Sequence, residues 1–126
     1  MGIKQRPSPG NANALSVASW GSVADESARV VALRFEWSDR SVSFPYTALL
    51  RWEWLGGDTE SLLMTFGKEL VSVRGRSLEA LRDGLDRGRL QSVREQGERH
   101  AEAGAGTLIR SITIEHNKNH TKVVAT

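Results

Sequence analysis

Cysteine is absent from this chain of 126 residues, which excludes disulfides, thiolate nucleophiles and cysteine-based zinc sites. Long apolar runs are absent too, and none approaches the roughly 18 residues of a transmembrane helix. Residues 1–20 carry positive charge but no continuous apolar segment of signal-peptide length. We therefore expect a cytoplasmic protein with no membrane partner, since a cysteine-free chain suits a reducing compartment.

Signatures of nucleotide binding and nucleophilic catalysis are also missing, because the chain has no GxGxxG or GxxxxGK string and no nucleophile elbow. His116 and His120 have the spacing of two metal ligands on one helix face, but the polar residues between them favour a solvated tail. Four acids could converge as carboxylates: Asp39, Glu53, Asp58 and Glu60. They lie at predicted turns or on an exposed strand face, where acids are common. We expect no catalytic residue, no metal site and no cofactor.

An excess of charge of one sign is nearly absent, because 17 basic and 15 acidic residues leave a net charge of +2. Composition alone therefore does not call for nucleic acid or a membrane surface. Arginine outnumbers lysine, thirteen to four, and arginine makes forked contacts to carboxylates and phosphates. This bias suits an interaction surface, and it equally suits a high-GC genome.

Residues 1–27 are predicted to form an N-terminal arm, because two prolines and Gly10 interrupt regular structure near its start. Weak alternation at residues 15–20 fits either a short strand or a loosely packed lead-in. Trp20 is expected to dock on the folded domain, since a tryptophan buries a large apolar area.

Alternation of apolar and polar residues dominates residues 28–73, and this period of two indicates strands with one buried face. In the clearest example, Val31, Leu33 and Phe35 share one face. The pattern predicts five strands, at residues 29–37, 41–46, 50–55, 61–66 and 69–73. Short turns join them, so we expect an antiparallel meander that curls into a bent sheet or a small barrel.

A stripe of apolar residues at helical spacing follows the strands and predicts one amphipathic helix over residues 78–96, with Ser77 as its N-cap. The stripe consists of Leu78, Leu81, Leu85, Leu90 and Val93. Gly88 is a point at which this helix could break into two pieces. The stripe should pack on the open face of the sheet, so residues 28–97 are expected to form the core of the domain.

Beyond this core, residues 98–106 are predicted to be a glycine-rich linker, residues 107–116 a final strand and residues 117–126 a polar tail. The final strand can pair back into its own sheet or reach the sheet edge of a neighbouring subunit. The predicted fold class is α+β. It is an antiparallel bent sheet or small barrel of five to six strands, capped by one amphipathic helix and followed by a further strand.

The turn before the predicted helix is the best candidate for an anion or partner contact. Gly75 and Ser77 offer backbone N–H groups there, and Arg74 and Arg76 flank them. A plain strand-to-helix turn, with arginines that pair with nearby acids, explains the same residues.

Tryptophans are concentrated in the predicted strands, which contain Trp37, Trp52 and Trp54. Such rings either fill the interior or stand at a rim, where they stack on a base or anchor a partner. Trp37 is the expected rim residue because it ends its strand at a turn.

Since no residue pattern indicates catalysis, we expect a non-catalytic interaction module that binds a protein or peptide or associates with itself. The alternative is a nucleic-acid-binding small barrel that uses a rim tryptophan and the arginines of the predicted helix. The arginines in and beyond that helix are Arg82, Arg87, Arg89, Arg94 and Arg99. Acids interleave with them, which is more typical of a solvated, salt-bridged face than of a phosphate track.

Overall fold

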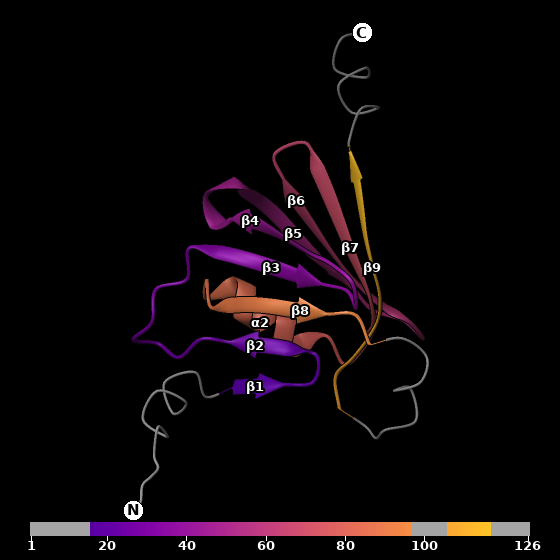
Figure 1. Cartoon of the computed structure of the whole chain (residues 1–126). Coiled ribbons are helices and arrows are strands. Elements are labelled where there is room, and N and C mark those ends of the chain that lie inside the picture. The colour runs from indigo at the N-terminus through magenta and orange to yellow at the C-terminus, as the bar shows by residue number, and fades with distance from the viewer. Residues whose placement is uncertain (1–15, 97–105, 117–126) are drawn as a thin grey trace, which may run out of the picture.

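The computed structural model describes residues 16–96 and 106–116, which form two sheets and one α-helix (Figure 1). One sheet has five strands in the order β1-β2-β8-β3-β4, and the other has four in the order β5-β6-β7-β9. The strands are β1 Ser16–Ala18, β2 Gly21–Val23, β3 Ala32–Glu36, β4 Ser41–Pro45, β5 Leu49–Leu55, β6 Glu60–Phe66, β7 Glu69–Arg76, β8 Leu90–Arg94 and β9 Leu108–His116. A 3-10 turn, η1, spans Tyr46–Ala48, and the α-helix, α2, spans Glu79–Asp86. No helix among the described residues has the length and apolar character needed to span a bilayer.

The predicted α+β class with one α-helix is confirmed, but the strands neither form a single meander nor close into a barrel. The chain changes sheets at η1, because the β3–β4 hairpin belongs to the five-stranded sheet whereas β5, β6 and β7 follow one another in the four-stranded sheet. β4 ends at Pro45, which has no backbone N–H to donate to a further ladder, and the 3-10 turn η1 leads from there into β5.

The predicted helix over residues 78–96 is wrong in its second half. α2 ends at Asp86, Gly88 takes a left-handed φ of +68°, and the chain then forms β8. β8 lies between β2 and β3, antiparallel to the first and parallel to the second. Leu90 and Val93 are buried, as a helical stripe would also require, so their spacing does not distinguish the two structures.

Part of the predicted N-terminal arm belongs to the five-stranded sheet. Residues 16–23 form the β1–β2 hairpin, and β2 pairs with β8. Trp20, in the turn of this hairpin, packs against the core as expected. Residues 1–15, with nearly all of the predicted linker (98–105) and the predicted tail (117–126), lie outside the described residues.

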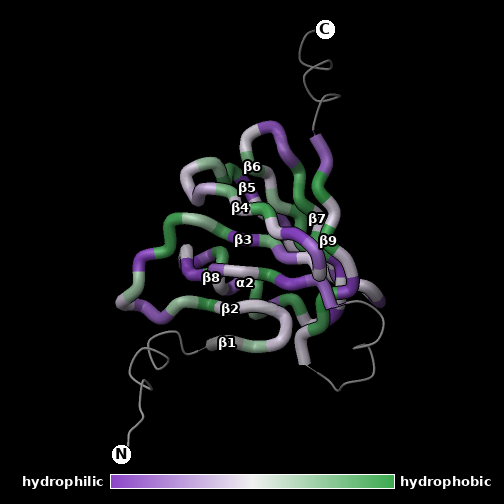
Figure 2. The backbone as a smooth tube through the Cα atoms, viewed as in Figure 1, coloured by the Kyte–Doolittle hydropathy of each residue, from purple (hydrophilic) through white to green (hydrophobic). Residues whose placement is uncertain are grey.

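The core lies between the two sheets and α2, and Figure 1 shows α2 behind β8 of the five-stranded sheet. Phe66 of β6 stacks on Phe44 of β4 with ring centroids 4.4 Å apart, and it meets Phe35 of β3 edge-on at 6.0 Å. The leucine stripe of the helix is buried as predicted: Leu78, Leu81 and Leu85. Hydrophobic and hydrophilic stretches alternate along the strands in Figure 2, which fits strands with one face in this core.

The final strand pairs back into its own sheet, where β9 lies antiparallel to β7 (Figure 1). Its other edge is bonded to the residues that follow β8. Gln96 N–H donates to Ile109 O at 2.9 Å, and Ile109 N–H donates to Gln96 Oε1 at 2.8 Å. Ile112 N–H donates to Glu95 Oε2 at 3.0 Å. Within residues 16–96 and 106–116, these bonds join the two sheets at β9, and no strand pairs with the outer edge of β5.

Gly75 lies where β7 and β9 approach closely, because a Cβ there would be 1.9 Å from the carbonyl oxygen of Leu108. We predict that Gly75→Ala lowers the free energy of unfolding by about 1–3 kcal/mol, since the two strands must move apart. Urea unfolding followed by tryptophan fluorescence measures this loss. Gly106→Ala is the matched control, because a Cβ at Gly106 meets nothing within 4 Å. Equal unfolding free energies for the two variants would contradict the prediction.

Candidate functional site

β5 is the outer strand of the four-stranded sheet, and no described strand pairs with its second edge. The described part of the chain exposes only three large hydrophobic residues, and β5 carries two of them. Leu50 is 66% exposed and Leu55 is 43% exposed. An open strand edge with exposed apolar side chains is a template for pairing with another chain.

Trp52 and Trp54 lie on the side of β5 that faces α2, half-buried against the core. Trp52 Nε1 donates to Asp86 Oδ1 at 2.7 Å, and Trp54 Nε1 donates to Glu60 Oε1 at 3.0 Å. The guanidinium of Arg82 lies 5.3 Å from the Trp54 ring centroid, a cation–π distance. Each ring therefore stands between core and surface, with its polar atom held by a carboxylate.

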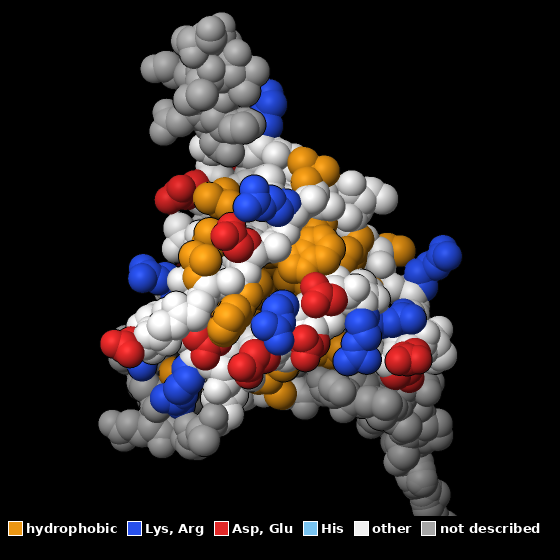
Figure 3. Space-filling model, turned by 180° about the vertical axis from the view of Figure 1, so that it is seen from behind, with side chains coloured by type: hydrophobic (Ala, Val, Ile, Leu, Met, Phe, Trp, Pro, Cys, Tyr) orange, Lys and Arg blue, Asp and Glu red, His pale blue; other side chains and the backbone are white. Residues whose placement is uncertain are grey.

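Charges of both signs surround the apolar side chains on the face of the molecule where α2 lies (Figure 3). On the side of β5 away from the core, Arg51 and Glu53 form an ion pair at 3.3 Å, with side chains that are 72% and 46% exposed. Such an exposed pair contributes little to the stability of a single domain. β5 thus combines an open backbone edge, exposed apolar side chains and two opposite charges that a partner can reach.

The turn predicted to hold an anion is occupied by a carboxylate of the chain itself. Ser77 N–H donates to Glu60 Oε2 at 2.9 Å, and Leu78 N–H donates to Glu60 Oε1 at 2.8 Å. The prediction that Ser77 is the N-cap of α2 is wrong. Leu78 holds that position, Ser77 has a φ of +54°, and no side-chain hydrogen bond caps the helix. Gly75 lies within β7, opposite β9. An external anion would have to displace Glu60 from these amides.

The other predicted contact residues are dispersed. Arg74 is exposed on β7, and Arg76 ends that strand opposite Leu108. Trp37, the predicted rim residue, is half-buried, and its Nε1 donates to Ile112 O of β9 at 3.2 Å. Since Trp37 follows β3, this bond ties the two sheets together.

The arginines proposed for nucleic-acid binding do not share one helix face. Arg82 lies in α2 and Arg87 at its C-cap, whereas Arg89 precedes β8 and Arg94 ends it. Arg99 lies outside the described residues. Each of the four described arginines contacts an acid or a carbonyl: Arg82 contacts Asp83, Arg87 contacts Glu26, Arg89 contacts the carbonyls of Glu26 and Ala28, and Arg94 contacts Glu36. Contacts of this kind compete with phosphate binding.

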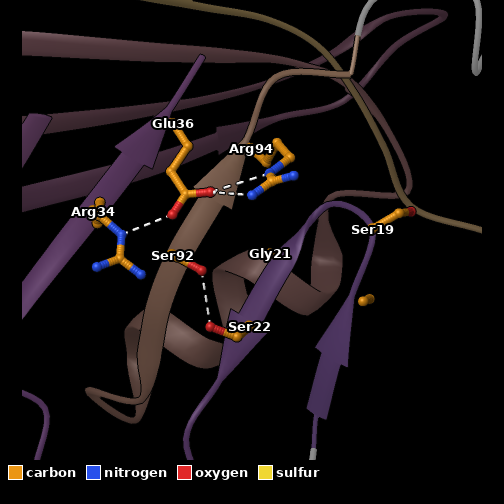
Figure 4. A pocket seen from close by; sticks show the side chains of 8 residues that line it. Ser19, Gly21, Ser22, Arg34, Glu36, Ser92 and Arg94 are labelled. Atoms are coloured by element: carbon orange, nitrogen blue, oxygen red, sulfur yellow. Dashed lines mark hydrogen bonds and ion pairs between the residues drawn. The ribbon is translucent and has the colours of Figure 1, made fainter. Parts of the chain in front are cut away.

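A polar hollow of about 330 Å³ lies on the five-stranded sheet, on the side away from the core (Figure 4). Glu36 accepts hydrogen bonds there from Arg34 and Arg94, both at 2.8 Å. The bond from Arg94 lowers the pKa of Glu36 by more than burial raises it, and Arg34 lowers the pKa further. The hydroxyls of Ser22 and Ser92 bond to each other at 2.8 Å. These polar groups already satisfy one another, so the hollow is a weaker candidate than β5.

Metal and acid–base sites receive little support from the geometry. The described residues include no group of three or more histidine, aspartate and glutamate side chains that could hold a metal ion. His116 Nδ1 lies 3.1 Å from Glu69 Oε2, and His120, its predicted neighbour, lies outside the described residues. Among the four candidate acids, Glu53 pairs with Arg51 and Glu60 holds the amides that precede α2.

The sequence pattern does not indicate Leu50 or Leu55 as functional residues, and it indicates Glu60 only as one of four acids that could converge. The alternation in LLRWEWL reveals the strand and its apolar face, but not that one edge of this strand stays open. The chain matches no protein-family model, no curated protein and no solved structure. The proposed function therefore depends only on the residues of β5 and their contacts.

Glu60 connects β6 to two other parts of the structure, because its carboxylate accepts the indole N–H of Trp54 and the two amides that precede α2. Burial raises the pKa of this carboxyl, but these hydrogen bonds and the charge of Arg82 lower it by more. The pKa of Glu60 therefore lies below its ordinary value of 4.5.

We predict that Glu60→Gln lowers the free energy of unfolding by about 1.5–3 kcal/mol near neutral pH, the range for hydrogen bonds to a charged group. Because folding lowers this pKa, the stabilisation is fully present above pH 4.5 and is lost as the pH falls through the folded-state pKa. Urea unfolding of both proteins across this range measures the difference. Glu53→Gln, at an exposed position, is the control. A stability difference that stays constant as the pH falls through the acid range would contradict the assignment.

Proposed function

We propose that this domain is a non-catalytic interaction module that binds a protein or peptide segment in extended conformation along β5. The observation that carries the proposal is the open edge of this seven-residue strand, with its two exposed leucines. A segment that adds to such an edge gains affinity from main-chain hydrogen bonds, and pockets for alternate side chains provide specificity.

The other sheet ends are less suited to strand addition. β1 has three residues, and β4 has five and ends at Pro45, which cannot donate to a ladder. The outer edge of β9 is bonded in part to Glu95 and Gln96. β5 therefore offers the longest open edge in the described part of the chain.

The two tryptophans beside this edge favour binding of a partner side chain. Their indole N–H groups are held by Asp86 and Glu60, so little rotamer freedom remains to be lost on binding. Half-buried, rigid aromatic rings of this kind are frequent anchors in protein interfaces.

We predict that peptides selected for binding from a random display library shift the backbone amide NMR signals of β5. Leu55→Lys should weaken a selected peptide about tenfold or more, because it places a charge where an apolar contact forms. Val31→Lys is the matched control, since Val31 is also exposed but precedes β3 in the other sheet. Amide shifts confined to other strands, or equal affinities for the two variants, would contradict the proposal.

Nucleic-acid binding is the second candidate function, on the basis of the arginine bias and the Arg82–Trp54 contact. A protein that neutralises Z phosphates shows a salt slope of about −0.9Z for duplex DNA. Since Arg82, Arg87, Arg89 and Arg94 already contact acids or carbonyls, we predict no retardation of single-stranded RNA or duplex DNA at about 50 mM salt. A salt-dependent mobility shift that Arg82→Ala abolishes would favour this second function.

A further inference from the structure

We propose that the strand that adds to β5 is β5 of a second copy of this chain, antiparallel and related by a twofold axis at Trp52. This inference rests on the proposed function, because it names the partner of the same open edge. Isologous twofold dimers are the commonest oligomers, and they require a surface that is complementary to itself. The sequence of β5 has that property.

The charges of β5 are antisymmetric about its central residue. Arg51 and Glu53 lie on either side of Trp52, and both are exposed on the side of the sheet away from the core. Antiparallel pairing about Trp52 places Arg51 opposite Glu53 of the second copy, and Glu53 opposite its Arg51. Opposite charges at directly opposed positions stabilise a strand pair, whereas like charges destabilise it.

Neighbouring registers are disfavoured by the same two side chains. A twofold axis at Glu53 would place Glu53 against Glu53, and an axis at Arg51 would place Arg51 against Arg51. An axis between two residues would oppose side chains from different sides of the sheet, which the pleat forbids. The register centred on Trp52 is therefore the favoured one.

On the core side of the sheet, the same register places Trp52 directly opposite Trp52 of the second copy, so that two half-buried rings meet at the axis. Leu50, the most exposed apolar residue of β5, lies at the irregularity of this strand, where the regular opposition of side chains ends. Leu49 faces the core and Leu55 lies on the other side of the sheet, so these two residues do not form a matched pair. The pairing of β5 with β6 is irregular between Leu49 and Arg51, so the regular ladder is short and the dimer is expected to depend on concentration.

The dimer would contain one continuous eight-stranded sheet, in the order β9-β7-β6-β5-β5-β6-β7-β9. Both ends of this sheet are β9 strands, each bonded in part to Glu95 and Gln96 of its own chain. The assembly should therefore stop at two copies and not grow into a filament.

Variants of the full chain in which Arg51 or Glu53 is replaced by a residue of opposite charge test the inference. Sedimentation velocity from about 1 µM to about 1 mM measures their dimerisation. Arg51→Glu and Glu53→Arg should each weaken the dimer about tenfold or more, because each replaces two attractive cross-strand pairs by two repulsive ones. The double variant Arg51→Glu/Glu53→Arg should dimerise again, and an equimolar mixture of the two single variants should form a heterodimer. Arg74→Glu, on the neighbouring strand β7 but away from the open edge, is the control and should dimerise as the wild type does.

A wild-type protein that stays monomeric over this range would overturn the inference, as would single variants that dimerise like the wild type. The proposed function is judged separately, by the selected peptides. If the protein is monomeric while peptides still shift the β5 amides, only the self-pairing fails. If the protein is monomeric and no selected peptide shifts the β5 amides, both proposals fail. Circular dichroism of each variant establishes that the fold is retained, and Arg51 and Glu53 are exposed enough for this to be expected.

Discussion

The carboxylate of Glu60 is the constraint on which the arrangement of α2, β5 and the tryptophans depends. The first amides of a helix have no partner within the helix, and a negative charge beside them is favourable. Glu60 reaches the amides of Ser77 and Leu78 from the first position of β6 and holds the indole of Trp54 at the same time. Because Asp86 holds Trp52 at the other end of α2, β5 and the helix are tied together at both ends.

The two ends of the four-stranded sheet differ, and this difference makes β5 the candidate site. At one end, Glu95 and Gln96 bond to β9 and connect the two sheets. At the other end, no strand of the described residues pairs with the outer edge of β5, which carries exposed leucines, a combination that natural proteins usually avoid. The charges of Arg51 and Glu53 do not block this edge. In the proposed dimer, they would favour one antiparallel register and oppose its neighbours.

Local patterns predicted much of the fold because they depend only on neighbouring residues. The alternation around Leu33 and Phe35 and the leucines at 78, 81 and 85 each report one buried face, and these residues are buried. The pattern does not distinguish a helix from a strand at residues 90–94, because Leu90 and Val93 fit both a helical stripe and a strand between two others. The turn at Ser77 has the local pattern of an anion site, but Glu60, which lies 17 residues away in the chain, accepts the hydrogen bonds of its amides.

By itself, the sequence determined the fold class, most strand positions, the buried face of α2 and the absence of cysteine chemistry, since these follow from composition and short-range periodicity. Only the tertiary structure decided the division into two sheets, the parallel place of β8 and the closure of the β9 edge. It also decided that, among the described strands, none pairs with the outer edge of β5 and that Leu50 and Leu55 are exposed. The indole of Trp37 instead donates to Ile112 O in the other sheet. These outcomes depend on which distant segments compete for the same backbone edge, and no local pattern records that competition.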